Sequence, residues 1–368
     1  MKMPKQRLTD RRDFLAAVAA GATLAAVAPS ALAGAAGRRL VKSNLIHLGI
    51  NMWGDDPAPT GEAPADSRTW PQDPTVARNP AWLTGCADYL RFDEDVYRKV
   101  IDRMAEKGMN QVVIDIGEGL VFPSHPEIAA KGALSADRMR GEVRRLKALG
   151  IEAIPKLNFS TTHNPWMGDY RRTVSTPAYY RLVEDLVRDV GEIFGTPRLF
   201  HLGMDEERYE VQKNYNVIIV RNAEQWWHDV RWMVSLCERL GMRPWLWTER
   251  LIYHRDKAEF ARRMPKAALL SAAYYGPVAD SLRSPEGSKG RYFLQHFLDL
   301  AELGYDQMPC VSNFNCEANA GELVPWLEER LPHALVPGYL MAPWRPCVKC
   351  FEAFQLRGVD LAAEAMKG

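Results

Sequence analysis

The sequence has almost no excess of charge of either sign. Lys and Arg together number 47 and Asp and Glu 46 among 368 residues. Proteins that bind nucleic acid or an anionic membrane through bulk charge carry a basic excess, so we expect neither partner. Long apolar runs are also lacking. No stretch approaches the roughly 18 consecutive apolar residues that indicate a membrane-spanning helix, and the mature protein is not expected to enter a membrane.

Cysteine and histidine are too sparse or wrongly spaced for several classes of protein. Six cysteines are too few for a disulfide scaffold. Cys347 and Cys350 have no second pair at zinc-site spacing, and no helix carries two histidines three to five residues apart. We therefore expect neither a metal site nor a cofactor. A disulfide between Cys316 and the Cys347/Cys350 pair is predicted only if their strands are neighbours.

Residues 1–33 have the pattern of an export signal. Residues 9–15 (Thr-Asp-Arg-Arg-Asp-Phe-Leu) resemble a twin-arginine motif, an alanine-rich apolar stretch follows, and residues 31–33 (Ala-Leu-Ala) resemble a cleavage site. We expect the twin-arginine machinery to export the protein to the periplasm or the cell exterior. Residues 34–44 are then a linker, and residues 45–368 a single domain.

The mature chain alternates eight times between a short apolar run and an amphipathic helix. The expected strands are 45–53, 111–116, 152–158, 198–205, 243–248, 268–275, 308–315 and 336–344. The expected helices are 93–107, 135–149, 177–194, 222–240, 256–263, 289–303, 320–331 and 348–366. The helices are predicted from apolar side chains at 3.6-residue spacing, and glycines follow five of them.

Eight strand–helix units without a hairpin signal predict a parallel sheet closed into a single-domain (β/α)8 TIM barrel. An open doubly wound sheet is the alternative, but residues 51–54 (Asn-Met-Trp-Gly) are not the glycine-rich phosphate turn that usually follows its first strand. The connections from strand to helix are long and those from helix to strand short. In a barrel, the long connections meet at the C-terminal mouth, where active sites lie.

The end of the fourth strand carries two adjacent carboxylates. Alternation along a strand places His201, Gly203 and Asp205 on the inward face, and Glu206 follows where the strand ends. Neighbouring carboxyl groups at a barrel mouth can be held in different protonation states, one ionised and one able to donate a proton. Glycoside hydrolysis needs this division of roles.

Residues 200–206 (Phe-His-Leu-Gly-Met-Asp-Glu) resemble the His-x-Gly-Gly-Asp-Glu motif of glycoside hydrolase family 20, the β-N-acetylhexosaminidases. Met204 stands where the family has a second glycine. The resemblance implies that Glu206 is the general acid and that Asp205 orients the 2-acetamido group of the sugar, whose carbonyl oxygen acts as internal nucleophile. It also implies that His163, after the third strand, corresponds to the histidine of the family's Pro-Gly-His turn.

Further polar and aromatic residues fall near the predicted strand ends. The candidate substrate-binding residues are His163, His201, Asn158, Asp115, Trp247, Tyr275, Asn313 and Trp344. Polar groups suit sugar hydroxyls and aromatic faces suit sugar rings. Tyr274 and Tyr275 are neighbours, and alternation turns only one of them inward. If Asp205 does not assist the substrate, a second carboxylate is expected among Asp115, Glu118, Glu249 and Glu317.

The sequence thus predicts an exported glycosidase that acts on a carbohydrate, with Asp205 and Glu206 as the catalytic pair. A relative that acts on a different sugar is equally compatible with the motif. Two other functions remain open: a metal-dependent barrel like the sugar isomerases, and a carbohydrate-binding barrel that has lost catalysis.

Overall fold

The computed structural model describes residues 39–58 and 81–367, so the predicted export signal lies outside the described residues. Its strands are β1 (Val41–His47), β2 (Gln111–Asp115), β3 (Glu152–Lys156), β4 (Leu199–His201), β5 (Arg243–Trp247), β6 (Leu269–Ser271), β7 (Cys310–Val311) and β8 (Gly338–Met341). They form one parallel sheet in the order β6-β5-β4-β3-β2-β1-β8-β7. Backbone hydrogen bonds from Met308 to Leu270 (2.8 Å) and from Cys310 to Ala272 (2.9 Å) join the two edges.

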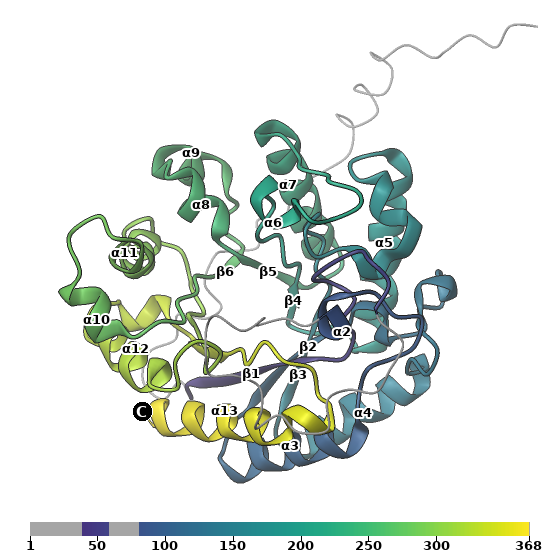
Figure 1. Cartoon of the computed structure of the whole chain (residues 1–368), viewed down its shortest axis with the longest axis horizontal. Helices are drawn as coiled ribbons and strands as arrows, with labels where there is room; N and C mark the ends of the chain where they lie inside the picture. The colour runs from purple at the N-terminus through teal and green to yellow at the C-terminus, as the bar shows by residue number, and fades with distance from the viewer. Residues whose placement is uncertain (1–38, 59–80, 368) are drawn as a thin grey trace, which may run out of the picture. The chain divides into compact units, whose positions relative to one another are not determined.

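The helices surround this sheet, as Figure 1 shows in a view into the barrel. They are α2 (Ala81–Thr84), α3 (Glu94–Glu106), α4 (Ala136–Ala148), α5 (Pro177–Ile193), α6 (Tyr209–Gln212), α7 (Ala223–Arg239), α8 (Glu249–His254), α9 (Lys257–Arg263), α10 (Val278–Arg283), α11 (Lys289–Glu302), α12 (Asn319–Glu328) and α13 (Glu352–Ala365). Short 3₁₀ helices lie at Gly117–Gly119, Pro126–Ile128, Pro165–Thr173, His333–Leu335 and Lys349–Phe351.

The predicted (β/α)8 barrel is confirmed, and each expected strand and helix has its counterpart. The strands differ from prediction at their ends. β1 begins at Val41, inside the expected linker, because polar Lys42 and Ser43 belong to the strand and hid its start. β4 ends at His201, four residues early, because Gly203 has a positive φ of 72°. An L-residue in an extended strand does not adopt this conformation.

Local sequence explains where the helices begin and end. The side chains of Asp93, Ser135, Thr176, Asn222 and Ser288 accept backbone N–H groups at the first turns of α3, α4, α5, α7 and α11. Such caps satisfy N–H groups that have no partner within the helix. The glycines that follow five of the helices all have positive φ, as expected: Gly108, Gly150, Gly195, Gly241 and Gly304.

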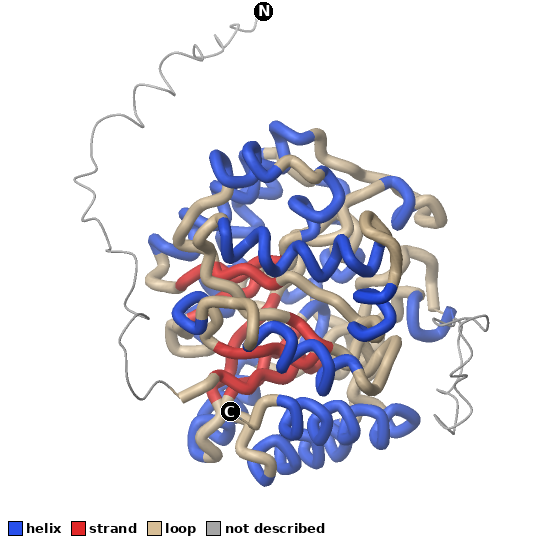
Figure 2. The backbone as a smooth tube through the Cα atoms, turned by 90° about the vertical axis from the view of Figure 1, so that its left-hand side faces the viewer, coloured by secondary structure: helices blue, strands red, loops and turns tan. Residues whose placement is uncertain are grey.

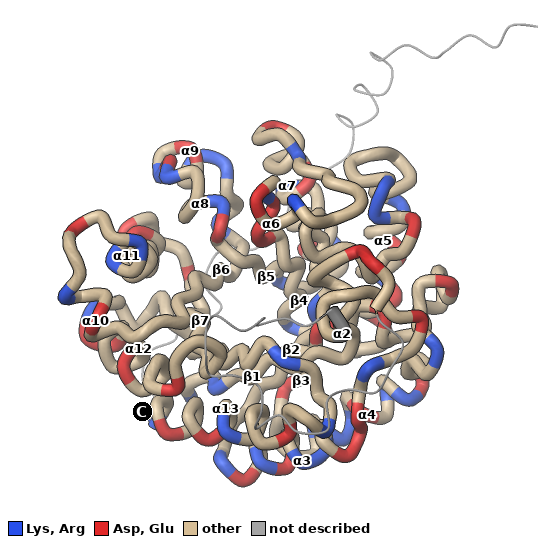
Figure 3. The backbone as a smooth tube through the Cα atoms, in the orientation of Figure 1, with Lys and Arg blue, Asp and Glu red and all other residues tan. Residues whose placement is uncertain are grey.

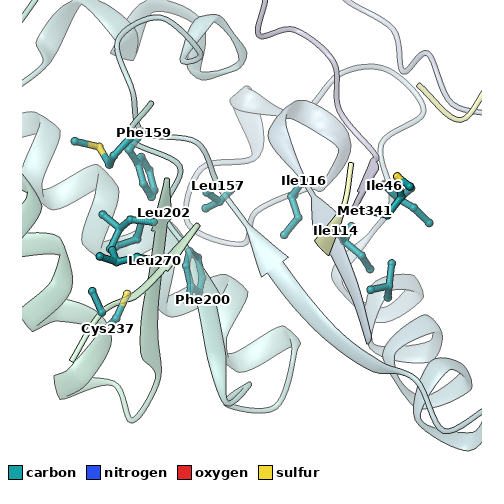
Figure 4. Packing of buried hydrophobic residues seen from close by; sticks show 14 of the residues in the cluster. Ile46, Ile114, Ile116, Leu157, Phe159, Phe200, Leu202, Cys237, Leu270 and Met341 are labelled. Atoms are coloured by element: carbon teal, nitrogen blue, oxygen red, sulfur yellow. The ribbon is translucent and has the colours of Figure 1, made fainter. Parts of the chain in front are cut away.

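Two apolar clusters stabilise the barrel. The larger lies between strands and helices, where Ile46, Ile114, Phe200 and Leu202 pack outward (Figure 4). The smaller fills the inside of the barrel, and Figure 2 shows the strands enclosed by helices. Each fully buried side chain of this size contributes about 1.5–3 kcal/mol. Together the clusters make the barrel a packed framework on which the loops at its mouth are held.

The outer surface mixes both charges, as Figure 3 shows along α3, α4 and α13. Within residues 39–58 and 81–367, no helix has the length and apolar character needed to cross a membrane. All six cysteines are free, so the expected disulfide is wrong. Cys347 and Cys350 are buried, whereas Cys316 lies in the partly exposed loop after β7.

Candidate active site

The inward-facing side chains change character along the first four strands. An apolar layer consists of Leu45, Val113, Ile154 and Leu199. Two residues further along the same strands, a polar layer consists of His47, Asp115, Lys156 and His201. Strand register pairs His47 with Asp115, Asp115 with Lys156, and Lys156 with His201. Because strand residues alternate between faces, both layers face the barrel interior.

The centre of the polar layer is the ion pair between Lys156 and Asp115. Lys156 Nζ donates to Asp115 Oδ2 at 2.5 Å, and His47 Nδ1 lies 3.1 Å from the same oxygen. Burial alone raises the pKa of Asp115, but Lys156 and His47 lower it overall. Burial also lowers the pKa of His201 well below its usual value, and its Nδ1 accepts the Gly203 N–H at 3.0 Å. The structure thus places Asp115 and His201 inside the barrel rather than on the wall of the cavity at its mouth.

The candidate catalytic residues follow β4 in a strained turn. Gly203, Met204 and Glu206 have φ values of 72°, 69° and 55°, in the left-handed region that costs a non-glycine residue about 1–3 kcal/mol. A Cβ on Gly203 would lie 2.0 Å from Asn158 Oδ1, so glycine is required here. The turn, rather than the predicted strand alternation, therefore determines where Asp205 and Glu206 lie.

Hydrogen bonds from the loop after β3 hold this turn. Asn158 Oδ1 accepts the Met204 N–H at 3.2 Å. Ser160 Oγ donates to the Asp205 carbonyl, and Thr162 Oγ1 donates to the Glu206 carbonyl at 2.7 Å. Backbone hydrogen bonds to the neighbouring strand segments continue as far as Gly203, and these side chains hold the turn beyond it. A strained turn persists only where its surroundings fix it in this way.

His163 joins the two candidate carboxylates. Its Nε2 lies 3.4 Å from Asp205 Oδ2 and 3.3 Å from Glu206 Oε2, while its Nδ1 lies 3.1 Å from the Met52 carbonyl oxygen. Burial alone lowers the pKa of His163, but both carboxylates raise it well above its usual value. Because each nitrogen faces an acceptor, the geometry also favours the doubly protonated imidazolium.

Asp205 is consequently an ionised carboxylate. Burial alone would raise its pKa, but His163, Lys156 and Asn158 together lower it well below its usual value. The Asn158 amide donates to Asp205 Oδ1 at 2.8 Å, and His163 faces the other carboxylate oxygen. Asn158 is itself buried, so its observed contacts position Asp205 and the turn.

A third carboxyl group lies on the opposite side of the turn. Glu249 begins α8, and its Oε2 accepts the Glu206 N–H at 2.8 Å. Arg208 Nη2 is 4.0 Å from the same oxygen. Burial raises the pKa of Glu249 well above its usual value, and the charges of Glu206 and Asp205 raise it further. A carboxyl group in such surroundings keeps its proton to higher pH than an exposed one.

These groups line a cavity of about 540 Å³. Asp205, Glu206 and Glu249 are on one wall. The aromatic residues lining it are Trp247, Tyr253, Tyr274, Tyr275, Phe293 and Trp344. The ring centroids of Trp344 lie 5.7 Å from Trp247 and 6.1 Å from Tyr275. A cavity of this volume accommodates a small ligand such as a sugar, with aromatic faces around it and carboxyl groups at one side.

The remaining candidates lie away from this cavity. Asn313 Nδ2 donates to the Phe354 carbonyl at 3.1 Å, which directs the side chain toward α13. Glu118 accepts the Ile50 and Asn51 N–H groups at 2.9 and 3.1 Å and anchors the loop after β1. Glu317 is exposed and pairs with Arg357 at 3.2 Å. Four residues were named as alternative second carboxylates: Asp115, Glu118, Glu249 and Glu317. Of these, Glu249 is the one that lines the cavity.

The sequence did not point to Lys156 as a site residue, and it indicated Glu249 only as an alternative second carboxylate. Lys156 had a readable signal, because it stands two residues after inward-facing Ile154 and two before Asn158. Glu249 follows Trp247-Thr248 at the end of β5, which is also a mouth position. Its contact with the Glu206 N–H depends on the left-handed turn, for which the sequence offers only Gly203 as a sign.

The structure was compared with known proteins. No family model and no curated protein matches the sequence. A chitobiase from Flavobacterium johnsoniae matches with a TM-score of 0.51 and 15% identity, covering 75% of this chain and 50% of that one. A β-N-acetylhexosaminidase from Bacteroides fragilis matches with a TM-score of 0.53 and 11% identity, covering 87% and 65%. The pneumococcal virulence factor StrH matches with a TM-score of 0.56 and 12% identity, covering 89% of this chain and 83% of that one.

This chain therefore spans only half of the chitobiase and just under two thirds of the Bacteroides enzyme. At such low identity, the likeness shows a shared fold: the barrel is similar to that of the family 20 hexosaminidases. Among the residues that the structure describes, no group of three or more His, Cys, Asp or Glu side chains is arranged to hold a metal ion.

Proposed function

We propose that the protein is a glycoside hydrolase acting on a 2-acetamido sugar, with Glu206 as general acid and Asp205 as the residue that orients the acetamido group. One observation carries the proposal: two adjacent carboxyl groups, joined by His163, line an aromatic cavity at the mouth of a barrel similar to the hexosaminidases. The similarity to a chitobiase and to a β-N-acetylhexosaminidase supports the choice of sugar.

The proposed reaction begins with attack of the acetamido carbonyl oxygen on the anomeric carbon. The bond to the leaving oxygen breaks, that oxygen takes its electron pair, and Glu206 supplies the proton. Asp205 accepts the acetamido N–H and stabilises the positive charge that develops on the resulting oxazolinium ring. Water then attacks the anomeric carbon, and the bond from that carbon to the acetamido oxygen breaks, which reopens the ring and restores the acetamido group. The attacking water loses a proton to Glu206, so the enzyme is restored and the configuration is retained.

Replacing Glu206 by Gln tests the role of the acid. The substrates are aryl 2-acetamido glycosides, one with a leaving group that needs protonation and one with a nitrophenolate that does not. We expect kcat/KM to fall by about 10²–10⁴-fold on the first substrate and much less on the second. Glu317→Gln is the matched control and should behave as wild type. Equal losses on both substrates, with folding intact, would overturn this role.

Binding of a thiazoline analogue of the oxazolinium intermediate tests substrate assistance separately. An analogue of a reactive intermediate binds more tightly than substrate when the site is complementary to it. Calorimetry should show tight binding to wild type. Substrate assistance is wrong if wild type does not bind the thiazoline and cleaves sugars with a free 2-hydroxyl. A mechanism with two catalytic carboxyl groups would then replace it, and Glu249 is the second carboxylate that the cavity offers. Sugar binding without turnover would instead support a binding barrel.

Export by the twin-arginine route is a further part of the proposal, supported by residues 9–15 and 31–33 of the sequence. Conservative replacement of both arginines, Arg11→Lys with Arg12→Lys, should leave the precursor in the cytoplasm. Fractionation of cells followed by immunoblotting measures this. Unchanged export of the double variant would contradict the assignment.

A further inference from the structure

Glu207 directly follows the candidate acid but does not share its surroundings. Asp205 and Glu206 line the 540 Å³ cavity, whereas Glu207 does not. Acidic side chains of such a run are ordinarily solvated, yet only 5% of the Glu207 side chain is exposed. An enclosed carboxylate at this point of the chain is held by partners inside the protein.

Both carboxylate oxygens of Glu207 accept backbone N–H groups, and the two donors belong to different loops. Oε2 accepts the Thr161 N–H at 3.2 Å, in the loop after β3. Oε1 accepts the Arg221 N–H at 3.1 Å, just before α7. An amide side chain has one acceptor oxygen, so glutamine here would turn its NH2 group toward one of these donors. The contacts therefore favour a carboxylate over its amide at this position.

The side chain of Arg221 supplies the opposite charge and connects three segments. It is 2% exposed, and its Nε lies 3.6 Å from Glu207 Oε1 and 3.2 Å from Asp229 Oδ2. Its Nη2 donates to the Phe159 carbonyl at 2.9 Å, and its Nη1 lies 3.7 Å from the Met204 sulfur. A planar guanidinium with five N–H groups suits this task. Arg221 thus joins the turn after β4 to the loop after β3 and to α7.

Asp229 holds the same guanidinium from the side of the helices. It is fully buried in α7, and its Oδ1 accepts the Tyr180 hydroxyl of α5 at 2.6 Å and the Gln225 amide of α7 at 2.8 Å. These contacts are with the helices, whereas those of Glu207 are made from the turn itself. Arg221 therefore has two carboxylate partners, one that belongs to the catalytic turn and one that does not.

We propose that Glu207 is a positioning residue for the acid: held between the Thr161 N–H and Arg221, it fixes the chain directly after Glu206 and so the direction in which the Glu206 carboxyl group faces. The inference rests on the proposed role of Glu206. The φ of Glu206 is 55°, a conformation that persists only where the surroundings fix it. Thr162 Oγ1 holds the Glu206 carbonyl, and Glu207 fixes the residue that follows.

The loss of this anchor should affect the acid more than Asp205. Asp205 has direct side-chain contacts of its own, with Asn158 at 2.8 Å and His163 at 3.4 Å. Glu206 has 37% of its side chain exposed, so its position depends more on its backbone. A displacement of about 1 Å can reduce a rate by about 10²-fold. Variants of Glu207 should therefore lose proton donation while they still bind substrate.

Kinetics of Glu207→Gln on the two aryl 2-acetamido glycosides tests this role. On the substrate whose leaving group needs a proton, we expect kcat to fall by about 10–10²-fold, with KM within about threefold of wild type. The loss should be much smaller on the nitrophenolate substrate. A role in folding alone would reduce both activities equally. If Glu207→Gln does not fold, Glu207→Asp keeps the charge and both acceptor oxygens on a shorter side chain, and it should show the same selectivity with a smaller loss.

Asp229→Asn is the matched control, because it removes the charge of the other carboxylate partner of Arg221. Its melting temperature should fall at least as far as that of Glu207→Gln, while kcat on both substrates stays within about threefold of wild type. Equal catalytic losses in the two variants would make the effect one of stability around Arg221 and overturn the positioning role. Equal losses on both substrates in Glu207→Gln would also overturn it.

Glu206→Gln separates this inference from the proposed function. If it loses activity on the substrate that needs a proton while Glu207→Gln keeps wild-type kinetics, the positioning role is wrong and the acid remains assigned. If Glu206→Gln itself keeps full activity on that substrate, the proposed function is refuted instead.

Hydrogen exchange provides a readout that does not depend on activity. In Glu207→Gln, the amide of Thr161 or of Arg221 should exchange faster than in wild type, because one of them loses its acceptor. In Asp229→Asn, the Thr161 amide should exchange at the wild-type rate. Mass spectrometry of peptides that contain these residues measures both. Unchanged exchange at both amides in Glu207→Gln would contradict the anchoring of Glu207.

Discussion

Asp115, at the end of β2, is buried, whereas Asp205, in the turn after β4, is half-buried, and the two aspartates differ in what surrounds them. Asp115 is enclosed by Lys156 and His47, with 1% of its side chain exposed. Asp205 is held by Asn158 and His163, has 14% exposed, and lines the 540 Å³ cavity. Both have a lowered pKa.

The comparison shows that burial and a shifted pKa do not by themselves identify a catalytic carboxylate. An ion pair inside the barrel shifts the pKa of Asp115 without access to any ligand. Asp205 differs because its partners leave one side of it facing an aromatic cavity. Strained backbone marks the same distinction, since left-handed residues adjoin Asp205, whereas Asp115 ends a regular strand. Perturbed titration is a guide to function only together with a cavity.

The largest expected effect is on stability and concerns the enclosed aspartate. Asp115→Asn leaves Lys156 as an uncompensated charge inside the barrel, where loss of one partner of a buried pair costs about 3–5 kcal/mol. Denaturation by urea should show this loss in the free energy of unfolding. Asp115→Leu combined with Lys156→Met removes both charges and should recover most of it. If the single variant is as stable as wild type, the pairing of Asp115 with Lys156 is wrong.

The second prediction concerns the aspartate at the cavity. Asp205→Asn keeps a hydrogen-bonding group but loses the charge proposed to stabilise the oxazolinium ring. We expect kcat/KM on a 2-acetamido glycoside to fall by about 10²–10³-fold, as when one transition-state contact is removed. Its free energy of unfolding should change less than that of Asp115→Asn. A variant within threefold of wild-type activity would refute the proposed role of Asp205.

The fold could be predicted from the sequence because each of its determinants is local. Apolar runs define the strands, 3.6-residue spacing defines the helices, and glycine and capping residues mark their ends. Residues 201–206 also pointed to a polar mouth. Strand alternation placed Leu202 and Met204 in the outer core as expected, but it could not predict the position of Asp205, which the left-handed turn determines.

Sequence patterns could not predict which side chains from distant parts of the sequence contact each other. The sequence predicted Asp115 at the mouth of the barrel, but Lys156, 41 residues later, donates to its carboxylate. Asn313 at the end of the seventh strand packs toward α13 instead of the cavity. Glu249 contacts the Glu206 backbone across 43 residues. Each of these outcomes depends on which polar group a neighbouring strand or loop presents.

A third prediction concerns Glu249, whose pKa is shifted in the opposite direction to those of Asp115 and Asp205. Asp115 and Asp205 have folded-state pKa values below their unfolded ones, so their stabilisation is present at neutral pH and is lost as pH falls. The pKa of Glu249 is raised, because burial and nearby carboxylates oppose its ionisation. Its neutral form therefore suits the folded state at low pH, and stability is lost as pH rises from the unfolded value of about 4.3 through the folded one.

Glu249→Gln removes this loss while keeping the acceptor for the Glu206 N–H. The melting temperatures of variant and wild type should therefore be similar near pH 4, and the variant should melt a few degrees higher at pH 8. Scanning calorimetry across this range measures the difference, with Glu317→Gln as the exposed control that should follow wild type. A difference that is independent of pH would mean that Glu249 ionises as easily in the folded protein as in the unfolded chain. The raised pKa of Glu249 would then be wrong, while the lowered pKa of Asp205 and its access to the cavity would still distinguish it from the enclosed Asp115.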